Sequence, residues 1–329
     1  FFFKQTTAYA IGVRLVGSEM CIRDRAYTEV AMGLANELGM QYLATETRRF
    51  PDGEGYLRTP VEGFNSMRSE PVIVVSSTFP DNGIVQTMMM LAGVADIQKG
   101  DLSNLKREGA QNLDDSGRRI LLAVPYYGYA RQDKRFSAGE VIAAGVIADH
   151  LATACDGIVI LDIHEPKVLE SHKHPIQFVS AVPEISDLLS TDVSPDFILS
   201  PDKGAIDRAK EVAEIIGVPY SYLEKKRIDA HTIEHTPKDL DVSGKVVAIV
   251  DDMISTGGTI CRASDALRRQ GATEVHAACT HGLFTSGALT RLVKHVDGVY
   301  STDSLSNPRA VVSGAPALAR GVKKLLTTL

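Results

Sequence analysis

The stretch that decides the fold runs from Lys245 to Thr259 and reads KVVAIVDDMISTGGT. Its apolar part, residues 246–250, is rich in β-branched side chains, which is typical of a strand buried on both faces. Two carboxylates follow the strand, and a short loop with two glycines leads into a helix predicted over residues 258–270. A buried strand that passes through a short loop into a helix predicts an α/β unit of a parallel sheet.

The loop after this strand carries residue types that suit a phosphate group. Glycine lets backbone N–H groups approach an anion closely, and the start of a helix adds partial positive charge. Hydroxyl groups donate further hydrogen bonds, and the paired aspartates can accept hydrogen bonds from a sugar or bind Mg²⁺ through water. Solvated acids before an ordinary helix cap are the simpler alternative. The whole arrangement favours a ribose-phosphate site formed by Asp251, Asp252, Ser255, Thr256, Gly257, Gly258 and Thr259.

The same alternation of strand and helix recurs along the chain. Short apolar runs predict further buried strands. Amphipathic segments between them predict helices, and glycines at 39, 217 and 271 stand where helices commonly end. The predicted strands cover residues 72–75, 120–124 and 158–161, and the predicted helices cover residues 27–38, 139–154 and 204–216.

Two polar stretches interrupt this rhythm. Residues 97–118 are interpreted as a surface insertion, and residues 226–243 as a mobile loop over a site. The second stretch contains an H-x-x-E-H pattern, at residues 231–235, of the kind found in zinc hydrolases. That pattern needs a helix, which its two β-branched residues and the following proline disfavour, so we interpret it as a chance match.

The composition limits the class of protein. The chain has 329 residues, which fits two domains, and its 44% hydrophobic and 23% charged residues indicate a soluble globular protein. A formal net charge of -6 argues against a nucleic-acid partner, and no apolar run approaches the roughly 20 residues that cross a membrane. The four cysteines form no C-x-x-C pair or zinc pattern, which favours reduced thiols and a cytoplasmic location.

Residues 1–25 are expected to lie outside the fold. They differ from a signal peptide, because Lys4 follows the first apolar residues and no clear small-residue cleavage site is present. The run at residues 15–25, LVGSEMCIRDR, resembles a translated sequencing adapter, so the segment is interpreted as foreign or artefactual. The first strand of the N-terminal sheet would then be missing or replaced by foreign sequence.

Five more segments occur in an informative order. They are RFPDGE at 49–54, PYYGYARQDKR at 125–135, LDIH at 161–164, LSPDKGA at 199–205 and EKKR at 224–227. The loop at 255–259 resembles the phosphoribosyl-diphosphate signature shared by phosphoribosyltransferases and ribose-phosphate pyrophosphokinases. The five segments resemble the pyrophosphokinases specifically, and the resemblance covers about residues 26–329. The stretch after the LDIH segment is similar to the archaeal-type branch.

The resemblance implies an enzyme of nucleotide biosynthesis, a ribose-phosphate diphosphokinase with Mg²⁺ as cofactor. It would transfer the β,γ-diphosphate of ATP to the C1 hydroxyl of ribose 5-phosphate and release AMP. Lys225 and Arg227 would be catalytic, and His164 and Asp202 would bind the metal. Asp202 and the loop at residues 255–259, called the phosphate loop below, would bind ribose 5-phosphate. The ATP contacts would come from Asp52, Gly53, Glu54, Arg131, Gln132, Asp133 and His164.

The implied roles agree with the chemistry of the residues. Transfer of a diphosphate concentrates negative charge, so catalysis should depend on positioning and on cations. Arg131 can stack on a base or bind phosphate with its forked guanidinium group, and the basic loop can close over the transferring group. Two alternatives remain open. A phosphoribosyltransferase would not need Arg131 and His164, and a non-catalytic regulator would have lost the ATP or basic-loop residues.

The expected fold is α/β, with two tandem phosphoribosyltransferase-like domains whose parallel sheets are flanked by helices. The ATP-side domain would span residues 26–180 and the ribose 5-phosphate-binding domain residues 181–309. The segment 310–329 would pack back on the first domain. The active site would lie between the domains. The family implies a homo-oligomer, a dimer or a hexamer, in which a neighbouring subunit completes the ATP site.

Two features depart from the family pattern. Ser255 stands where many members have an acid, although its hydroxyl still suits phosphate. Residues 165–170 lack an aromatic pair that is familiar from bacterial members. Since that stretch often contributes to subunit contacts and allosteric sites, regulation by phosphate and ADP stays open.

Overall fold

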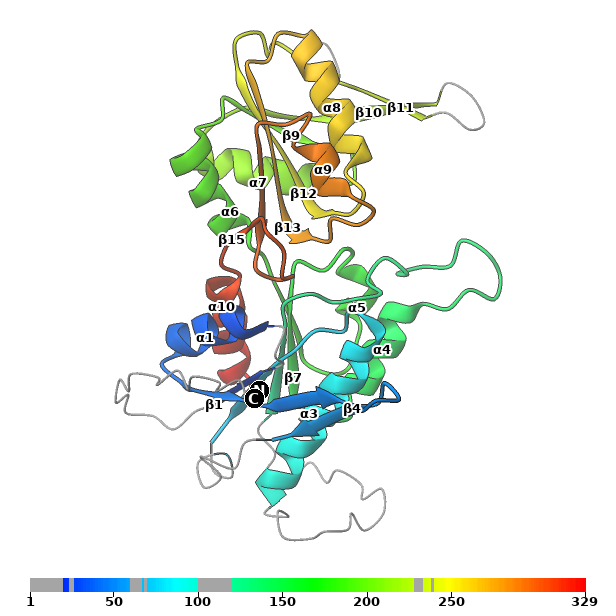
Figure 1. Ribbon diagram of the computed structural model, residues 1–329, viewed down its shortest axis with the longest axis vertical. Coiled ribbons are helices and arrows are strands. Elements are labelled where there is room, and N and C mark those ends of the chain that lie inside the picture. Colours follow the sequence, from blue (N-terminus) through cyan, green and yellow to red (C-terminus); the bar gives the residue numbers. More distant parts are fainter. Residues whose placement is uncertain are drawn as a thin grey trace, which may run out of the picture.

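The computed structural model describes residues 20–23, 27–59, 67, 70–99, 120–227, 233–237 and 240–329. These residues form two lobes, each built around a parallel sheet with helices on both faces (Figure 1). The first lobe contains β1–β8, α1, α3–α5 and the C-terminal helix α10, and the second contains β9–β15 and α6–α9. The expected fold class is therefore confirmed.

The first lobe holds a six-stranded sheet of order β2-β1-β5-β6-β7-β8, in which all pairs are parallel. Its strands are β1 (Met20–Arg23), β2 (Gln41–Ala44), β5 (Val72–Val75), β6 (Ile120–Val124), β7 (Gly157–Leu161) and β8 (Ile176–Val179). Its helices are α1 (Thr28–Leu38), α3 (Asp81–Lys99), α4 (Ala143–Ala152) and α5 (Lys167–Glu170). A separate antiparallel hairpin joins β3 (Glu46–Arg49) to β4 (Gly55–Arg58).

Both faces of the first sheet are buried. On β5, Val72 and Val74 pack with α3 and α4, whereas Ile73 and Val75 pack with α1 and α10. Successive strand residues point to opposite faces, so a sheet with helices on both sides needs apolar residues at every position. This explains the uninterrupted apolar runs in the sequence.

The second lobe holds a seven-stranded sheet of order β11-β10-β9-β12-β13-β14-β15, parallel except for the β10–β11 pair. Its strands are β9 (Phe197–Ser200), β10 (Tyr220–Arg227), β11 (Ile233–Pro237), β12 (Val246–Ile254), β13 (Glu274–Gly282), β14 (Gly298–Thr302) and β15 (Ala310–Val312). Its helices are α6 (Val182–Leu188), extended by a π-helical turn to Val193, α7 (Ile206–Ile216), α8 (Gly258–Arg269) and α9 (Ala288–Leu292).

Helix α10 (Ala315–Leu326) follows the second lobe in the chain but packs on the first, beside α1 (Figure 1). Leu318 and Val322 are fully buried in the same core as residues of β5, β6 and β7. Glycine at position 321 allows this close approach, because a Cβ there would lie 2.5 Å from Val159 Cγ1. Arg320 also pairs with Glu184 of α6 at 2.5 Å, which connects α10 to the second lobe.

The structure differs from three expectations based on the sequence. Residues 20–23, expected outside the fold, form β1 between β2 and β5. The stretch 226–243, expected as a loop, contains part of the β10–β11 hairpin, so the end of the H-x-x-E-H pattern lies in a strand and not a helix. The insertion expected at 97–118 begins in α3, and residues 100–118 lie outside the described residues.

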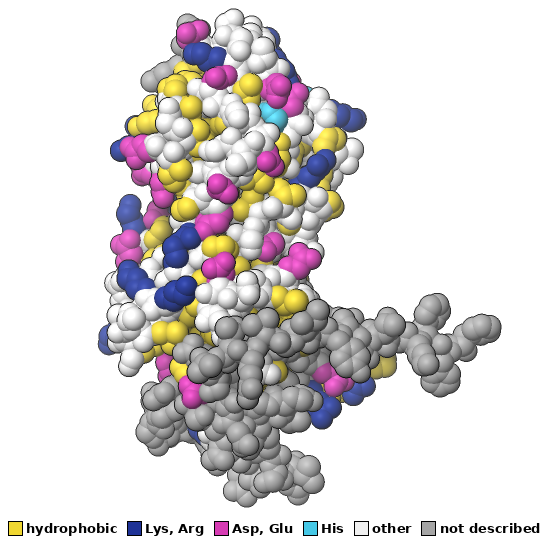
Figure 2. Space-filling view, turned by 90° about the vertical axis from the view of Figure 1, so that its left-hand side faces the viewer, with side chains coloured by type: hydrophobic (Ala, Val, Ile, Leu, Met, Phe, Trp, Pro, Cys, Tyr) yellow, Lys and Arg dark blue, Asp and Glu magenta, His cyan; other side chains and the backbone are white. Residues whose placement is uncertain are grey.

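The described helices and cysteines add two observations. No helix in the described part of the chain combines the length and apolar character that a membrane span requires. Cys261 and Cys279 are free and buried, and Cys155 is buried beside His174. Acidic, basic and apolar side chains intermingle on the coloured part of the face in Figure 2.

Candidate active site

A cleft of about 990 Å³ is lined by both lobes. Strands β6 and β7 of the first sheet and β9 and β12 of the second direct their carboxyl ends toward it. Ligands of open α/β sheets bind at that edge because the loops after the strands gather there. The cleft brings together Arg131, Asp133, His164, Asp202, Asp251, Asp252 and Ser255 of the residues expected from the sequence.

One hydrogen bond joins the ATP-side and ribose-side residues across the cleft. His164, three residues after β7, places Nδ1 2.6 Å from Asp252 Oδ2 at the end of β12. The hydrogen bond to Asp252 raises the pKa of His164 despite partial burial. Burial opposes ionisation of Asp252, but the hydrogen bond from His164 and nearby positive charges lower the pKa of that carboxyl. Asp252 is therefore the anionic partner of His164.

The neighbouring carboxyl of Asp251 behaves differently. Burial and the negative charge of Asp252 raise the pKa of Asp251 well above its ordinary value. Two adjacent carboxyls in a partly buried site do not ionise with equal ease, because each charge disfavours the other. Of the two carboxyls, Asp252 therefore ionises more readily, and Asp251 keeps its proton to a higher pH.

Neighbouring residues fix the conformation of the phosphate loop. Gly257 adopts a left-handed conformation, with φ +73°, before α8 begins at Gly258. Arg291 donates a hydrogen bond of 2.8 Å to the Thr256 carbonyl, and the Ser255 and Thr285 hydroxyls lie 3.0 Å apart. These contacts set the path of the loop into the helix, and Thr259 lies in the first turn of that helix.

Asp202 lies in the cleft but also shapes its own turn. Its Oδ1 accepts hydrogen bonds from the backbone N–H groups of Gly204, at 2.8 Å, and Ala205, at 3.2 Å. This turn leads into α7. Asp202 therefore has a structural role in this turn, in addition to the ligand role expected from the sequence.

The segment 125–135 is anchored to the loop after β5. Thr78 Oγ1 accepts a hydrogen bond of 2.6 Å from the Gly128 N–H. A Cβ at Gly128 would lie 2.5 Å from the Thr78 carbonyl oxygen, so only glycine fits this approach. Tyr126 reaches the second lobe, where its ring lies 4.8 Å from the ring of His281. Arg131 and Asp133 line the cleft, whereas Gln132 is absent from its described lining.

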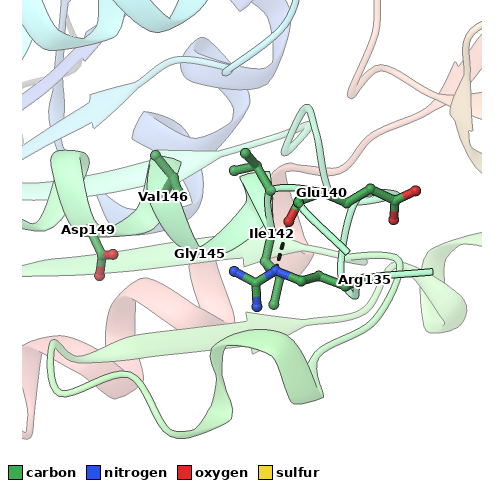
Figure 3. Close-up of a pocket in the computed structure, with 8 residues that line it drawn as sticks. Arg135, Glu140, Ile142, Gly145, Val146 and Asp149 are labelled. Carbon is green, nitrogen blue, oxygen red and sulfur yellow. Dashed lines mark hydrogen bonds between the residues drawn. The ribbon is translucent and has the colours of Figure 1, made fainter. Parts of the chain in front are cut away.

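Several expected residues lie elsewhere. Asp52, Gly53 and Glu54 form the turn of the β3–β4 hairpin, outside the described lining of the cleft. Lys225 and Arg227 belong to β10, whose backbone pairs with β11, and their side chains lie outside the description. A second hollow of about 650 Å³ contains none of the expected site residues (Figure 3). In it, Arg135 Nε donates a hydrogen bond to the Glu140 carbonyl oxygen, at 2.7 Å.

Four polar residues at the cleft were not expected from the sequence: Asp162, Thr280 and His281, which are buried, and Arg208, which is largely buried. Signals for two of them exist in hindsight. Asp162 directly follows a buried strand, as Asp251 follows the apolar run at 246–250, and His281 lies near the carboxyl end of a buried strand. The sequence around Arg208 predicts only a solvent-exposed helix residue, and no local pattern distinguishes it from other charged residues of α7.

Two parallel α/β sheets, with paired acids and a phosphate loop at the carboxyl end of a central strand, define a protein with two phosphoribosyltransferase-like domains. Residues 20–155 match the N-terminal domain of ribose phosphate pyrophosphokinase, and residues 178–314 match the phosphoribosyl transferase domain. The chain belongs to the ribose-phosphate pyrophosphokinase family, and it is an enzyme.

Individual relatives agree with this assignment. A ribose-phosphate pyrophosphokinase of Methanopyrus kandleri is 37% identical, over 89% of this chain and 94% of the relative. One of Pyrococcus furiosus is also 37% identical, over 83% and 90%. The crystal structure of phosphoribosylpyrophosphate synthetase from Mycobacterium smegmatis has a TM-score of 0.75 and 28% identity, covering 95% of this chain and 100% of that one.

Proposed function

We propose that the cleft between the lobes transfers the β,γ-diphosphate of ATP to ribose 5-phosphate, giving 5-phosphoribosyl 1-diphosphate and AMP. The 2.6 Å hydrogen bond between His164 and Asp252 carries this proposal. It joins the segment expected at the ATP phosphates to the segment expected at the sugar. A protein that bound only one substrate would not need the two segments in contact.

On the ribose side, Asp251 and Asp252 would hold the sugar hydroxyls, while Ser255 to Thr259 would bind the 5-phosphate. The loop offers hydroxyl groups and the N-terminus of α8, which together suit a phosphate group. The C1 hydroxyl oxygen would then attack the β-phosphorus, and the bond from that phosphorus to the bridging oxygen of AMP would break. The attacking hydroxyl would lose its proton as the new bond forms.

On the ATP side, Arg131, Asp133 and His164 occupy the opposite wall of the cleft. Arg131 would contact the base or the phosphates, with Gln132 beside it. Lys225 and Arg227, at the end of β10, would approach the transferring diphosphate and offset the charge that it concentrates.

The donor set of the cleft fits Mg²⁺. Carboxylate oxygens and one imidazole face the cleft, and Mg²⁺ prefers oxygen ligands. Among the described residues, no three His, Cys, Asp or Glu side chains are arranged to hold a metal by themselves. This suits an ion that reaches the protein with the ATP phosphates, where it would neutralise phosphate charge. His164 and Asp202 would meet it.

Asp52, Gly53 and Glu54 suit a different arrangement. They form the turn of an exposed hairpin, outside the described lining of this chain's own cleft. In a homo-oligomer, a dimer or a hexamer, this turn would complete the ATP site of a neighbouring subunit. The free thiols of Cys261 and Cys279 fit a reducing compartment, so we place the enzyme in the cytoplasm.

A coupled assay for AMP tests the proposed function. Purified protein should release AMP from ATP and Mg²⁺ only when ribose 5-phosphate is added, and phosphorus NMR should show one diphosphate ester for each AMP. Asp252→Asn is the matched variant, since it removes the charge that holds His164 and keeps nearly the same volume. A phosphoribosyltransferase would instead consume the diphosphate ester with a nucleobase. Folded protein that releases no AMP contradicts the proposal.

A further inference from the structure

A largely buried ion pair joins the two lobes at the wall of the cleft. Arg208, in the first turn of α7, places Nη1 2.8 Å from Oδ1 of Asp162, which follows β7. Only 16% of the arginine side chain and 4% of the aspartate side chain are exposed. Two charges with so little solvent contact persist only where further hydrogen bonds satisfy them.

Hydrogen bonds occupy almost all of the acceptor positions of Asp162. Its Oδ2 accepts hydrogen bonds from the Thr280 hydroxyl, at 2.6 Å, and from the Ala181 N–H, at 2.9 Å. Its Oδ1 accepts a third from the Ser180 hydroxyl, at 3.0 Å, and its backbone carbonyl accepts a fourth from His281 Nε2, at 3.1 Å. Asp162 also has φ +40°, a conformation that a residue other than glycine keeps only when its surroundings enforce it.

The same network touches both halves of the cleft. Asp162 lies two residues before His164, so its backbone sets the direction in which His164 leaves β7. Thr280 and His281 lie on β13, which pairs with β12 next to Asp251. Arg208 itself lines the cleft together with Asp251 and Asp252. One guanidinium group therefore contacts the ATP-side lobe while facing the acids of the ribose side.

We propose that Arg208 is a positioning residue, which holds His164 of the first lobe in register with the Asp251–Asp252 pair of the second through its contact with Asp162. This inference deepens the proposed function and rests on it. Arg208 acts through Asp162 and β7 and needs no contact with either substrate. Each half-site can then bind its own substrate, and Arg208 determines whether the two substrates meet.

This role predicts a separation of binding from turnover. A misplacement of about 1 Å between reacting groups can slow a reaction by about 100-fold. Arg208→Gln removes the charge that Asp162 needs, and we expect kcat to fall about 100-fold. Arg208→Lys keeps the charge but loses the forked geometry, so we expect a smaller fall. Thr280→Val keeps the side-chain volume but removes one hydrogen bond to Asp162, so it should also lower kcat.

The experiment measures both quantities in each variant. Calorimetry gives the Kd of ATP with Mg²⁺ and the Kd of ribose 5-phosphate, each titrated alone, and the AMP assay gives kcat. Arg320→Gln is the matched control, because it breaks another ion pair between the lobes that does not line the cleft. We expect both Kd values of Arg208→Lys to stay within about threefold of wild type, and kcat of Arg320→Gln to stay unchanged.

An activity-independent measurement separates this inference from the proposed function. Spin labels at Lys173→Cys and Lys294→Cys report the distance between the lobes, and its distribution should broaden in Arg208→Gln but not in Arg320→Gln. If wild-type protein releases no AMP, the proposed function is contradicted, but the positioning role of Arg208 is not. Unchanged kcat and an unchanged distance distribution in the Arg208 variants would overturn the positioning role. The positioning role would also be overturned if substrate binding weakened in proportion to the fall in kcat. An equal fall of kcat in Arg320→Gln would overturn it as well.

Discussion

At the scale of single residues, partners decide the charge states in the cleft. Asp251 and Asp252 are neighbours in sequence and chemically identical, yet the pKa of Asp251 is raised and that of Asp252 is lowered. Burial and the adjacent charge act on Asp251, whereas His164 donates a hydrogen bond to Asp252. The order of the two aspartates on the strand therefore matters for their roles.

Lys225 provides a prediction at this scale. We expect Lys225→Ala to lower kcat about 100- to 1000-fold, as loss of one charge-stabilising group does, while ATP binds within about threefold of wild type. Lys226→Ala is the matched control, because it removes the same charge from the adjacent position in the sequence. Steady-state kinetics and ATP titration check this. Equal turnover in the two variants would remove Lys225 from catalysis.

At the scale of elements, the phosphate loop depends on one backbone conformation. Gly257 has φ +73°, and a Cβ there would lie 3.0 Å from Leu292 Cγ. A left-handed conformation costs other residues roughly 1–2 kcal/mol. Glycine at this position therefore serves the path of the loop and the packing of α9 behind it.

Gly257→Ala should therefore weaken ribose 5-phosphate binding. We expect its KM to rise about tenfold, which corresponds to roughly 1.4 kcal/mol. Gly244→Ala is the control, since Gly244 has the same φ of +73° but open space around it and lies before β12. That variant should lose stability without a change in KM. The interpretation fails if both substitutions raise KM alike.

Strand β1 is the second element with a testable role. It pairs with β2 on one side and β5 on the other, so its removal would leave both partners with unpaired edges. Deletion of residues 1–25 should lower Tm by about 5 °C or more, since 1 kcal/mol shifts Tm roughly 2–4 °C for a domain of about 150–250 residues. Deletion of residues 1–19 retains β1 and is the comparison. Identical melting curves would show that β1 adds nothing to the sheet.

At the scale of the whole molecule, buried polar groups connect the two lobes. His281 of β13 contacts the Asp162 carbonyl, the Ser304 hydroxyl and the ring of Tyr126. Burial lowers the pKa of His281 below its ordinary value of 6.5, so the folded chain keeps it neutral. Helix α10 adds an apolar connection through the core that it shares with both sheets.

This burial predicts an acid-sensitive stability. Below about pH 6.5 the unfolded chain binds a proton at His281 that the folded chain does not, so the free energy of unfolding decreases as pH falls. We expect His281→Gln to remove up to about 1.4 kcal/mol per pH unit of this dependence between pH 6.5 and 5.5. Urea unfolding at several pH values measures it, with His150→Gln as a surface-histidine control. An unchanged slope in His281→Gln would contradict the assignment.

Local patterns in the sequence were enough for the fold class and much of the cleft. Runs such as 72–75 and 246–250 predict strands covered on both faces, because each position must be apolar there. The phosphate loop was readable because its acids, glycines and hydroxyls lie within nine residues of one strand end. Family resemblance then related the segments 49–54, 125–135 and 161–164 to ATP, 199–205 to the ribose, and 224–227 to catalysis.

The connection between the half-sites was decided only in the tertiary structure. Arg208 is 46 residues from Asp162 in sequence, and Thr280 is 118 residues from it, so no periodicity or motif relates them. The same holds for β1 and α10, whose partners are chosen by sheet order and by the shared core. The sequence by itself identified several of the segments that line the cleft, because those signals are local. Packing of the two lobes alone determined how His164 meets Asp252, since that contact depends on long-range burial.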